Sequence, residues 1–294
     1  MSISRCNVHT DPSRMETTQH GDLLFPLACY EDDMETMDVP MHWHKEMEYI
    51  LVVKGRISGH VGMEEMTLKE GEGILINNGI LHSVKQCRHT SVLHSLVFHP
   101  QLIGGVTHSF YYQNLIAPFY DNASLPYVRM DGTQKWHQDF ADHMMSAWHS
   151  VTCEVDGYPI EARFHMSKAM MILSRPLPST VSPVQDTEMM ERMKQLLQYI
   201  DLHYQNTMNN GVLMRIAACS ESVLLRSFRR TLGISPMQYV MKIRIDKARQ
   251  LLTATDLKAG QIGKEVGYED FSYCTKVFHR MTGMTPMEYR KQSR

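Results

Sequence analysis

The sequence has no long apolar run, no paired cysteine motif and no fingerprint of the common enzyme classes. No stretch of its 294 residues approaches the ~20 apolar residues that a membrane-spanning helix needs. The first 22 residues lack the apolar segment of a signal peptide, so we expect a cytoplasmic protein. The six cysteines form no CxxC pair, which argues against a zinc ribbon or a disulfide framework. No GxSxG elbow, P-loop or dinucleotide-binding fingerprint occurs in a fitting context.

Charge is nearly balanced over the whole chain, at −2, but it is unevenly distributed. Residues 188–294 contain 17 Lys and Arg against 10 Asp and Glu, a net charge of +7. Residues 1–187 contain 13 against 22, a net charge of −9. A basic C-terminal third beside an acidic remainder predicts two domains, of which the C-terminal one binds a polyanion.

Short strand-like segments fill the region from residue 23 to about residue 100. Apolar runs at residues 49–53, 73–76 and 92–98 alternate with turn signals such as Asn77-Asn78-Gly79. Several short strands at about ten-residue spacing are typical of a β-sandwich or a β-barrel. We therefore expect an N-terminal β-domain, preceded by a flexible arm at residues 1–22.

The periodicity changes to that of helices after about residue 131. A large apolar side chain recurs every four residues and predicts one face of a helix: Trp136, Phe140, Met144 and Trp148. This face is our candidate for a dimer surface, and the alternative is that it packs against the barrel. Residues 160–173 predict a second helix. The Pro- and Ser-rich segment 174–187 predicts a linker, and the rest of the chain has helical patterns.

One feature of the helical part occurs twice, fifty residues apart. Residues 232–239 are LGISPMQY and residues 282–289 are TGMTPMEY. In each copy a Ser or Thr N-cap precedes Pro at the first helical position and Gln or Glu at the third, which is the pattern of a capping box. Gly233 and Gly283 come two residues before these N-caps and suit the left-handed residue that ends a helix. Each copy therefore predicts the end of one helix and the start of the next.

The repeat extends upstream into two helix-turn-helix units. In the first, a helix leads to a turn at Ala218-Cys219 and then to a second helix capped by Ser220. In the second, Asp270 takes the N-cap position. The outward faces of the second helices are predicted to lie in successive major grooves, which recur about 34 Å apart along DNA.

A predicted helix at residues 236–253 connects the two units. Its length of about 27 Å suits a rigid spacer between two recognition helices on one side of a duplex. Four basic side chains are expected to be exposed on it and to add positive charge: Lys242, Arg244, Lys247 and Arg249.

Residues 188–294 resemble the DNA-binding domain of AraC-type transcription regulators. The resemblance rests on FRRTLGISPMQY, RIDKARQLL, VGYEDFSYCTKVFHR and GMTPMEYR. It implies that both helix-turn-helix units contact double-stranded DNA, and it implies RNA polymerase and a second copy of the chain as further partners. The DNA-binding positions that it implies are Ser222, Leu225, Arg226 and Arg229 in the first unit and Ser272, Thr275, Lys276 and Arg280 in the second.

The sequence departs from this family pattern at four positions. Ala218 stands where Gly is usual in the turn, and Gly263 stands where Ala is usual. Cys274 replaces an aromatic residue, and Leu225 is apolar where a polar residue is common. Because leucine contacts a thymine methyl but forms no hydrogen bond with a base, we expect the first unit to discriminate weakly or to recognise T.

A group of polar side chains in the β-domain forms a candidate ligand site. His42 and His44 share a face of a strand because side chains alternate, and a neighbouring strand is expected to bring His82 opposite them. With Glu48 they make a ligand set that suits Fe, Mn, Ni or Zn. The spacing resembles the two motifs of cupins, with Asn77 in place of the usual Pro.

The cupin resemblance leaves three interpretations of His42, His44, Glu48 and His82 open. They line an effector pocket that needs no cofactor, they bind a metal ion, or they are ordinary polar residues of strands. AraC-type regulators with a cupin-like sensor often keep such histidines around a small-molecule pocket, and the family does not imply a metal.

We therefore expect an α+β multidomain protein, with an N-terminal cupin-like β-barrel flanked by helices and a C-terminal all-α domain with two helix-turn-helix units. After the arm, the predicted boundaries are 23–173 for the cupin-like effector-binding and dimerisation domain, 174–187 for the linker and 188–294 for the DNA-binding domain. The expected function is that of a non-enzymatic, sequence-specific transcription regulator controlled by a small-molecule effector. The alternative is a metal-dependent cupin enzyme, of the dioxygenase or isomerase type, fused to a DNA-binding domain.

Overall fold

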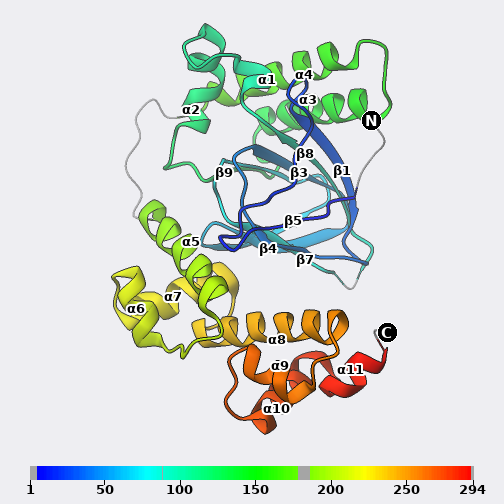
Figure 1. Ribbon diagram of the computed structural model, residues 1–294. Coiled ribbons are helices and arrows are strands. Elements are labelled where there is room, and N and C mark those ends of the chain that lie inside the picture. The colour runs from blue at the N-terminus through cyan, green and yellow to red at the C-terminus, as the bar shows by residue number, and fades with distance from the viewer. Residues whose placement is uncertain (1–4, 88, 178–185, 293–294) are drawn as a thin grey trace. The chain divides into compact units, whose positions relative to one another are not determined.

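Two antiparallel sheets lie at the centre of the first unit of the computed structural model, residues 1–190 (Figure 1). The structure describes residues 5–87, 89–177 and 186–292. The larger sheet has the order β1-β8-β3-β6-β9 and the smaller one the order β2-β7-β4-β5. The strands are β1 (Leu27–Asp33), β2 (Val39–His42), β3 (Met47–Lys54), β4 (Arg56–Val61), β5 (Glu64–Lys69), β6 (Gly73–Ile76), β7 (His82–Lys85), β8 (Val92–Phe98) and β9 (Tyr127–Met130). This arrangement confirms the predicted β-rich cupin region.

Side chains of the larger sheet alternate between two apolar cores. On β3, Met47 and Tyr49 belong to a core shared with helices, whereas Ile50 and Val52 belong to a core between the sheets. The alternation follows from the two-residue period of a strand, and burial on both faces explains why the run is continuously apolar. Glu48 shares the face of Ile50 and therefore points between the two sheets.

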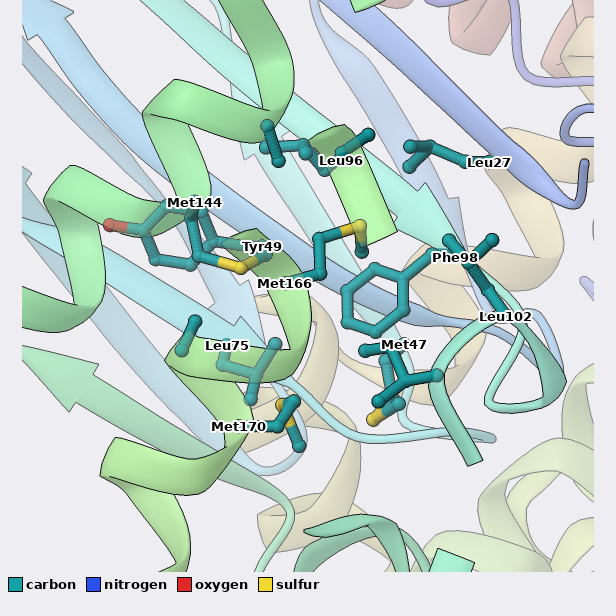
Figure 2. Close-up of a cluster of buried hydrophobic side chains, with 14 of the residues drawn as sticks. Leu27, Met47, Tyr49, Leu75, Leu96, Phe98, Leu102, Met144, Met166 and Met170 are labelled. Carbon is teal, nitrogen blue, oxygen red and sulfur yellow. The ribbon is translucent and has the colours of Figure 1, made fainter. Parts of the chain in front are cut away.

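Helices α3 (Lys135–Thr152) and α4 (Tyr158–Ser174) cover the outer face of the larger sheet (Figure 1). Figure 2 shows Met144 of α3 and Met166 and Met170 of α4 near Tyr49 and Leu75 of the sheet. The shorter helical segments α1 (Gln101–Gly104), η1 (Tyr112–Ile116) and α2 (Ala117–Tyr120) complete this layer. The outer core is thus a sheet-on-helix layer that closes one side of the barrel.

The apolar face of α3 that was predicted as a dimer surface lies inside this core. Phe140 and Met144 are fully buried, and the Phe140 ring packs edge-on against Tyr49 at 5.4 Å between centroids. Trp148 donates a hydrogen bond from Nε1 to the carbonyl of Tyr30 at 3.2 Å. The prediction of a dimer surface on this face is wrong, because the sheet of the same chain already covers it.

The N-terminal segment is packed rather than loose from residue 5 onward. Glu16 N donates to the carbonyl of Trp43 at 2.8 Å, and Trp43 N donates to the carbonyl of Arg14 at 3.0 Å. Trp43 Nε1 donates to Ser13 O at 2.9 Å. This differs from the flexible arm expected at residues 1–22, because the segment pairs with the backbone just after β2.

The second unit, residues 191–294, is helical in all its regular elements within the described residues. Its helices are α5 (Asp186–His203), which begins before the division, α6 (Asn210–Ala217), α7 (Glu221–Leu232), α8 (Pro236–Ala254), α9 (Ala259–Glu265), α10 (Phe271–Thr282) and α11 (Pro286–Gln292). Figure 1 shows α8 running between the two helical pairs of this unit. The predicted linker, residues 174–187, lies mostly outside the described residues.

The duplicated capping motifs are confirmed in detail. Ser235 Oγ accepts from Gln238 N at 3.3 Å while Gln238 Oε1 accepts from Ser235 N at 2.8 Å. Thr285 and Glu288 make the same reciprocal pair, with Thr285 N donating to Glu288 Oε2 at 2.8 Å. Gly233 has φ 70° and ends α7 in the left-handed region, as the sequence predicts. Among the helices that the structure describes, none is long and apolar enough to cross a bilayer.

Candidate DNA-binding surface and buried histidine cluster

Helices α7 and α10 have the same pattern of buried and exposed positions. Leu224 and Phe228 of α7 are fully buried, and so are their counterparts Cys274 and Phe278 of α10, with 3% exposure at most. These residues recur at i and i+4 and therefore lie on one side of each helix. They attach each second helix of the pair to its unit and leave the opposite side free.

The eight side chains predicted to contact DNA lie on that opposite side. Six of them are exposed and two, Leu225 and Thr275, are half-buried. The exposed ones are Ser222, Arg226, Arg229, Ser272, Lys276 and Arg280. The structure thus brings a hydroxyl and a cation to the same place on each helix, with Arg226 and Lys276 at matched positions.

Helices α7 and α10 each begin directly after the predicted N-cap residue. Asp270 accepts hydrogen bonds from Ser272 N at 2.7 Å and Tyr273 N at 3.4 Å, which satisfies two free amides of the first turn. Ser220 occupies the N-cap of α7. Its hydroxyl lies 3.1 Å from that of Ser222.

A residue at the start of α10 was missed by the sequence analysis. Phe271 is 42% exposed and is the first residue of the helix. A Cβ placed on Gly263 would lie 3.3 Å from Phe271 Cδ2 and 3.5 Å from Cys274 Sγ. The glycine at position 263, where the family usually has Ala, therefore leaves room for this ring. The proximity of Gly263 to Phe271 and Cys274 is visible only in the tertiary structure.

The spacer helix α8 carries less free positive charge than predicted. Arg244 is half-buried and donates from Nε to Tyr204 O at 2.8 Å and from Nη2 to Asn206 O at 2.9 Å. These carbonyls follow the end of α5, so Arg244 connects α8 to the segment after that helix. Lys242 and Arg249 are exposed, as expected, whereas Lys247 is half-buried, with Nζ 5.9 Å from the centroid of the Tyr204 ring. The prediction that Arg244 is exposed is wrong, because its guanidinium group binds backbone carbonyls within the same unit.

His42, His44, Glu48 and His82 form one buried cluster in the first unit. One potential ligand atom from each residue lies within 4.8 Å of those of the other three. His42 stands opposite His82 in the register of β2 and β7, and their ring centroids are 4.2 Å apart. His44 follows the end of β2, and its ring lies 5.1 Å from that of His82. Glu48 reaches the cluster from β3.

Backbone carbonyls orient all three imidazoles in the same way. His42 Nδ1 lies 2.8 Å from Pro40 O, His44 Nδ1 lies 3.1 Å from Glu46 O, and His82 Nδ1 lies 2.8 Å from Ile80 O. In this arrangement each Nδ1 donates its proton to a carbonyl, and each Nε2 turns toward the cluster, where His44 Nε2 lies 3.3 Å from Glu48 Oε2. Metal-binding histidines have their outer nitrogen held in this way.

The inner nitrogens are consistent with a metal ligand set. His82 Nε2 lies 2.9 Å from Glu48 Oε2, yet it makes no aligned hydrogen bond with any of the described residues. At this separation both atoms can bind one common ion. Three imidazoles and one carboxylate, all buried, therefore fit a transition metal.

Electrostatics within the cluster is dominated by burial and by Glu48. Burial opposes ionisation of the Glu48 carboxyl, but His44 and His82 outweigh it and hold its pKa well below the usual value. Burial, together with the neighbouring imidazoles, holds the pKa of His42 well below its usual value. Burial also opposes the charging of His82, but Glu48 reverses the effect and raises its pKa. A neutral His42 has the protonation state that metal binding requires.

Two further side chains from the N-terminal segment lie beside the cluster. Glu16 Oε2 is 3.6 Å from His42 Nε2 and 3.1 Å from His20 Nε2, and His20 Nδ1 is 2.9 Å from Tyr30 Oη. Glu16 and His20 are both buried, with 7% exposure. The sequence analysis missed them because the segment was expected to be a flexible arm; their i, i+4 spacing alone carries no signal for a strand-paired segment.

The space between the sheets next to His82 is small. A cavity of about 20 Å³ is lined by apolar side chains of both sheets, among them Ile50, Ile57 and Val84, together with His82. A cavity of this size holds about one water molecule. Larger ligands therefore need a displacement of side chains or of the N-terminal segment.

Comparisons with known proteins match both units. A helix-turn-helix domain family matches residues 213–292, and a cupin domain family matches residues 33–97. The uncharacterised HTH-type transcriptional regulator YdeC of Bacillus subtilis strain 168 is 26% identical over 98% of this chain and 99% of its own length.

Other relatives match the second unit alone. The HTH-type transcriptional activator RhaR of Escherichia coli strain K12 is 42% identical over 25% of this chain and 26% of its own length. This chain thus spans about a quarter of RhaR but nearly all of YdeC. Among solved structures, the C-terminal domain of the two-component response regulator yesN from Fusobacterium nucleatum is 30% identical, covering 32% of this chain and 93% of that chain, with a TM-score of 0.32.

Proposed function

Because the chain is an AraC-type transcription regulator that carries a cupin domain, we propose that it recognises specific sequences in double-stranded DNA under the control of a ligand bound in that domain. One observation carries the proposal. Two helix-turn-helix units present chemically matched side chains at the same helical positions, joined by a single helix, α8.

The basic residues of the two recognition helices fall into two pairs with different roles. Arg226 and Lys276 lie at the centre of the exposed faces, where they reach base edges; an arginine binds guanine through two parallel hydrogen bonds. Arg229 and Arg280 lie nearer the C-terminal ends, where cations pair with phosphates and fix the position of the helix. The net charge of +7 over residues 188–294 supports binding to the DNA backbone.

The test of DNA recognition is a selection from random duplexes with the full-length protein. A regulator of this kind enriches a site with two half-boxes about one helical turn apart. Arg226→Ala and Lys276→Ala should each alter one half-box and leave the other intact. Enrichment of no sequence over random competitor at moderate ionic strength would disprove the proposed function.

The ligand site that we propose in the cupin domain is the buried cluster of His42, His44, Glu48 and His82. Its nearby cavity is too small for an effector without rearrangement, so binding there is expected to move side chains or the N-terminal segment. Since that segment pairs with Trp43, between His42 and His44, ligand binding and the packing of residues 5–22 are coupled by direct contacts.

A metal ion is the second candidate for this site, and the geometry of the cluster favours it. His42, His44, Glu48 and His82 would hold the ion, which would supply a Lewis-acidic centre for an oxygen or nitrogen ligand. In a metal-dependent cupin enzyme the same residues would keep an open coordination position.

Elemental analysis of purified protein tests the metal. Stoichiometric Fe, Mn, Ni or Zn that is lost in His44→Ala and kept in His149→Ala, an exposed histidine of α3, would establish the site. Metal below a tenth of the protein concentration in the wild type, after growth in metal-supplemented medium, would leave a metal-free ligand pocket.

A second copy of the chain and RNA polymerase are the protein partners that we propose, with the protein acting in the cytoplasm. Exposed apolar side chains on the outer side of α4, Ile160 at 76% and Phe164 at 52%, support α4 as the contact between copies. Replacing Phe164 with Glu should then lower the mass observed by light scattering. An unchanged mass for a dimeric wild type would place the contact elsewhere.

A further inference from the structure

We propose that Phe271 is a base-contacting residue that recognises the 5-methyl group of a thymine. This inference rests on the proposed function, in which α7 and α10 contact successive major grooves. An exposed aromatic side chain, rather than a polar one, then sets the base preference at the N-terminal end of the second recognition helix.

The position of Phe271 places it at the end of the helix that enters a groove first. It is the first residue of α10, directly after the N-cap Asp270. It precedes Thr275 by four residues, and Thr275 Oγ1 donates to Phe271 O at 3.0 Å. Residues four apart lie on the same side of a helix, so Phe271, Thr275 and His279 form one stripe. N-terminal residues of a recognition helix are the ones that contact base edges.

The ring is supported on one side and open on the other. Gly263 of α9 lies beneath it, close enough that a Cβ there would be 3.3 Å from Phe271 Cδ2. The side chain nevertheless keeps 42% of its surface exposed. A ring held against a neighbouring helix loses little conformational freedom when a partner covers its free side. The free surface is therefore well suited to binding an apolar group.

The chemistry of the major groove identifies that group. The thymine methyl is the apolar group that base pairs present there, and phenylalanine is among the side chains that contact it. Phe271 has no hydrogen-bond donor or acceptor to offer to the other base edges. An unmatched polar edge against the ring loses its water without gaining a hydrogen bond, which selects against other bases.

The first helix-turn-helix differs at the position equivalent to Phe271 and so provides an internal contrast. Glu221 begins α7, and Asn210 Nδ2 of α6 donates to Glu221 Oε1 at 2.9 Å. The apolar residue of that stripe is Leu225, one turn later. Four residues of helix rise about 6 Å, so the apolar contacts of the two units are displaced along their helices by one turn. The two half-boxes should therefore require thymine at different places.

The experiment removes the methyl group from DNA without changing any other atom of the base edge. In the site selected by the full-length wild type, each thymine is replaced singly by deoxyuridine, and binding is measured by fluorescence anisotropy. At one position of the half-box altered by Lys276→Ala, the wild type should lose about three- to tenfold in affinity, as expected for the contact of one methyl group.

The variants show whether the loss belongs to Phe271. Phe271→Ala should bind the thymine and deoxyuridine sites equally, and Phe271→Leu should keep part of the preference. Phe110→Ala removes a 75% exposed phenylalanine outside the helix-turn-helix units, in residues 1–190, and should behave as the wild type. Circular dichroism of each variant checks that α10 is formed.

Two results would overturn the inference alone. A site that is bound specifically but tolerates deoxyuridine at every position of the half-box altered by Lys276→Ala would refute it while leaving the proposed function intact. In the half-box altered by Lys276→Ala, a deoxyuridine effect that persists unchanged in Phe271→Ala would assign the methyl contact to another residue. If no sequence is selected at all, the proposed function fails and the inference fails with it.

Discussion

The two helix-turn-helix units share one design and differ in how the turn is built. Each turn contains a left-handed residue after the first helix: Ala218 at φ 46° in the first unit and Gly267 at φ 87° in the second. Two residues separate the end of α6 from the N-cap Ser220, whereas four separate the end of α9 from Asp270, so the second turn is two residues longer. A glycine adopts this conformation freely, but an alanine does so at a cost of about 1–2 kcal/mol.

The surroundings of the two residues explain why only one of them must be glycine. A Cβ on Gly267 would lie 2.6 Å from Gln205 O and 2.9 Å from Tyr204 O, both of which are backbone atoms. Ala218 has its Cβ accommodated and its amide bonded to the carbonyl of Arg215. A repeated sequence pattern thus sets the same local fold twice, while contacts with neighbouring segments decide which substitutions each copy tolerates.

The largest effect is expected from Gly267→Ala. The new Cβ would collide with backbone oxygens, and alanine would be strained at this positive φ. Together these effects should destabilise the second helix-turn-helix by about 3 kcal/mol. Hydrogen exchange of α9 and α10 amides measures the loss. Gly283→Ala is the matched control: its φ is also positive, at 76°, but nothing lies within 4 Å of the added Cβ, so about 1 kcal/mol is expected. Equal losses in both variants would contradict the collision.

The two matched cations should rank next and should differ from each other. Arg226→Ala is expected to cost about 2–3 kcal/mol of binding to the selected site, because arginine can bind a guanine through two hydrogen bonds. Lys276→Ala is expected to cost about 1–2 kcal/mol, because an ammonium group acts as a point charge. Competition binding over a salt series measures both, with Arg163→Ala on the first unit as control. A loss that is uniform across sequences, with a flatter salt dependence, would show a phosphate contact instead.

A smaller effect of opposite sign is expected at the first turn. Ala218→Gly should stabilise the first helix-turn-helix by about 0.5–1 kcal/mol, since relief of the left-handed strain exceeds the entropy that glycine adds to the unfolded chain. Hydrogen exchange of α6 and α7 measures the gain. A loss of protection would mean that Ala218 makes contacts with its methyl group that outweigh the strain.

The smallest difference concerns pH and the two capping boxes. Hydrogen bonds from Thr285 hold the pKa of Glu288 below its usual 4.5. A carboxyl with a lowered pKa stabilises the fold above 4.5 and loses this contribution as the pH falls through its folded pKa. Exchange of the Thr285 amide should therefore accelerate in acid relative to that of Ser235, whose partner Gln238 does not titrate. Parallel behaviour of the two amides would contradict this role of Glu288.

Most of the helical unit could be predicted from local signals. The capping boxes, the helix-ending glycines and the apolar spacing fall within single helices or turns, where neighbouring residues in sequence are neighbours in space. The connecting helix α8 matches its predicted span closely, from Pro236 to Ala254. The contacts of Arg244 could not be predicted from local signals, because its partners Tyr204 and Asn206 lie 40 and 38 residues earlier in the chain.

The β-sheet unit, residues 1–190, was harder to predict at the points where distant segments meet. The spacing of His42, His44 and Glu48 suggested a shared site, and the structure places them with His82 in one cluster. The pairing of the N-terminal segment with Trp43, which brings Glu16 beside His42, has no local signature. The burial of Phe140 against the sheet likewise could not be separated from a dimer contact by periodicity alone.

The sequence by itself determined the two-domain plan, the duplicated helix-turn-helix, the caps of its helices and the residue types at the matched exposed positions. These depend on periodicity, capping chemistry and charge, all of which act over a few residues. Only the tertiary structure decided which side chains stand together between the sheets, which arginine is taken up by packing and which phenylalanine is left open at the start of α10. Those outcomes depend on contacts between segments far apart in the chain, and side-chain pattern alone does not specify such contacts.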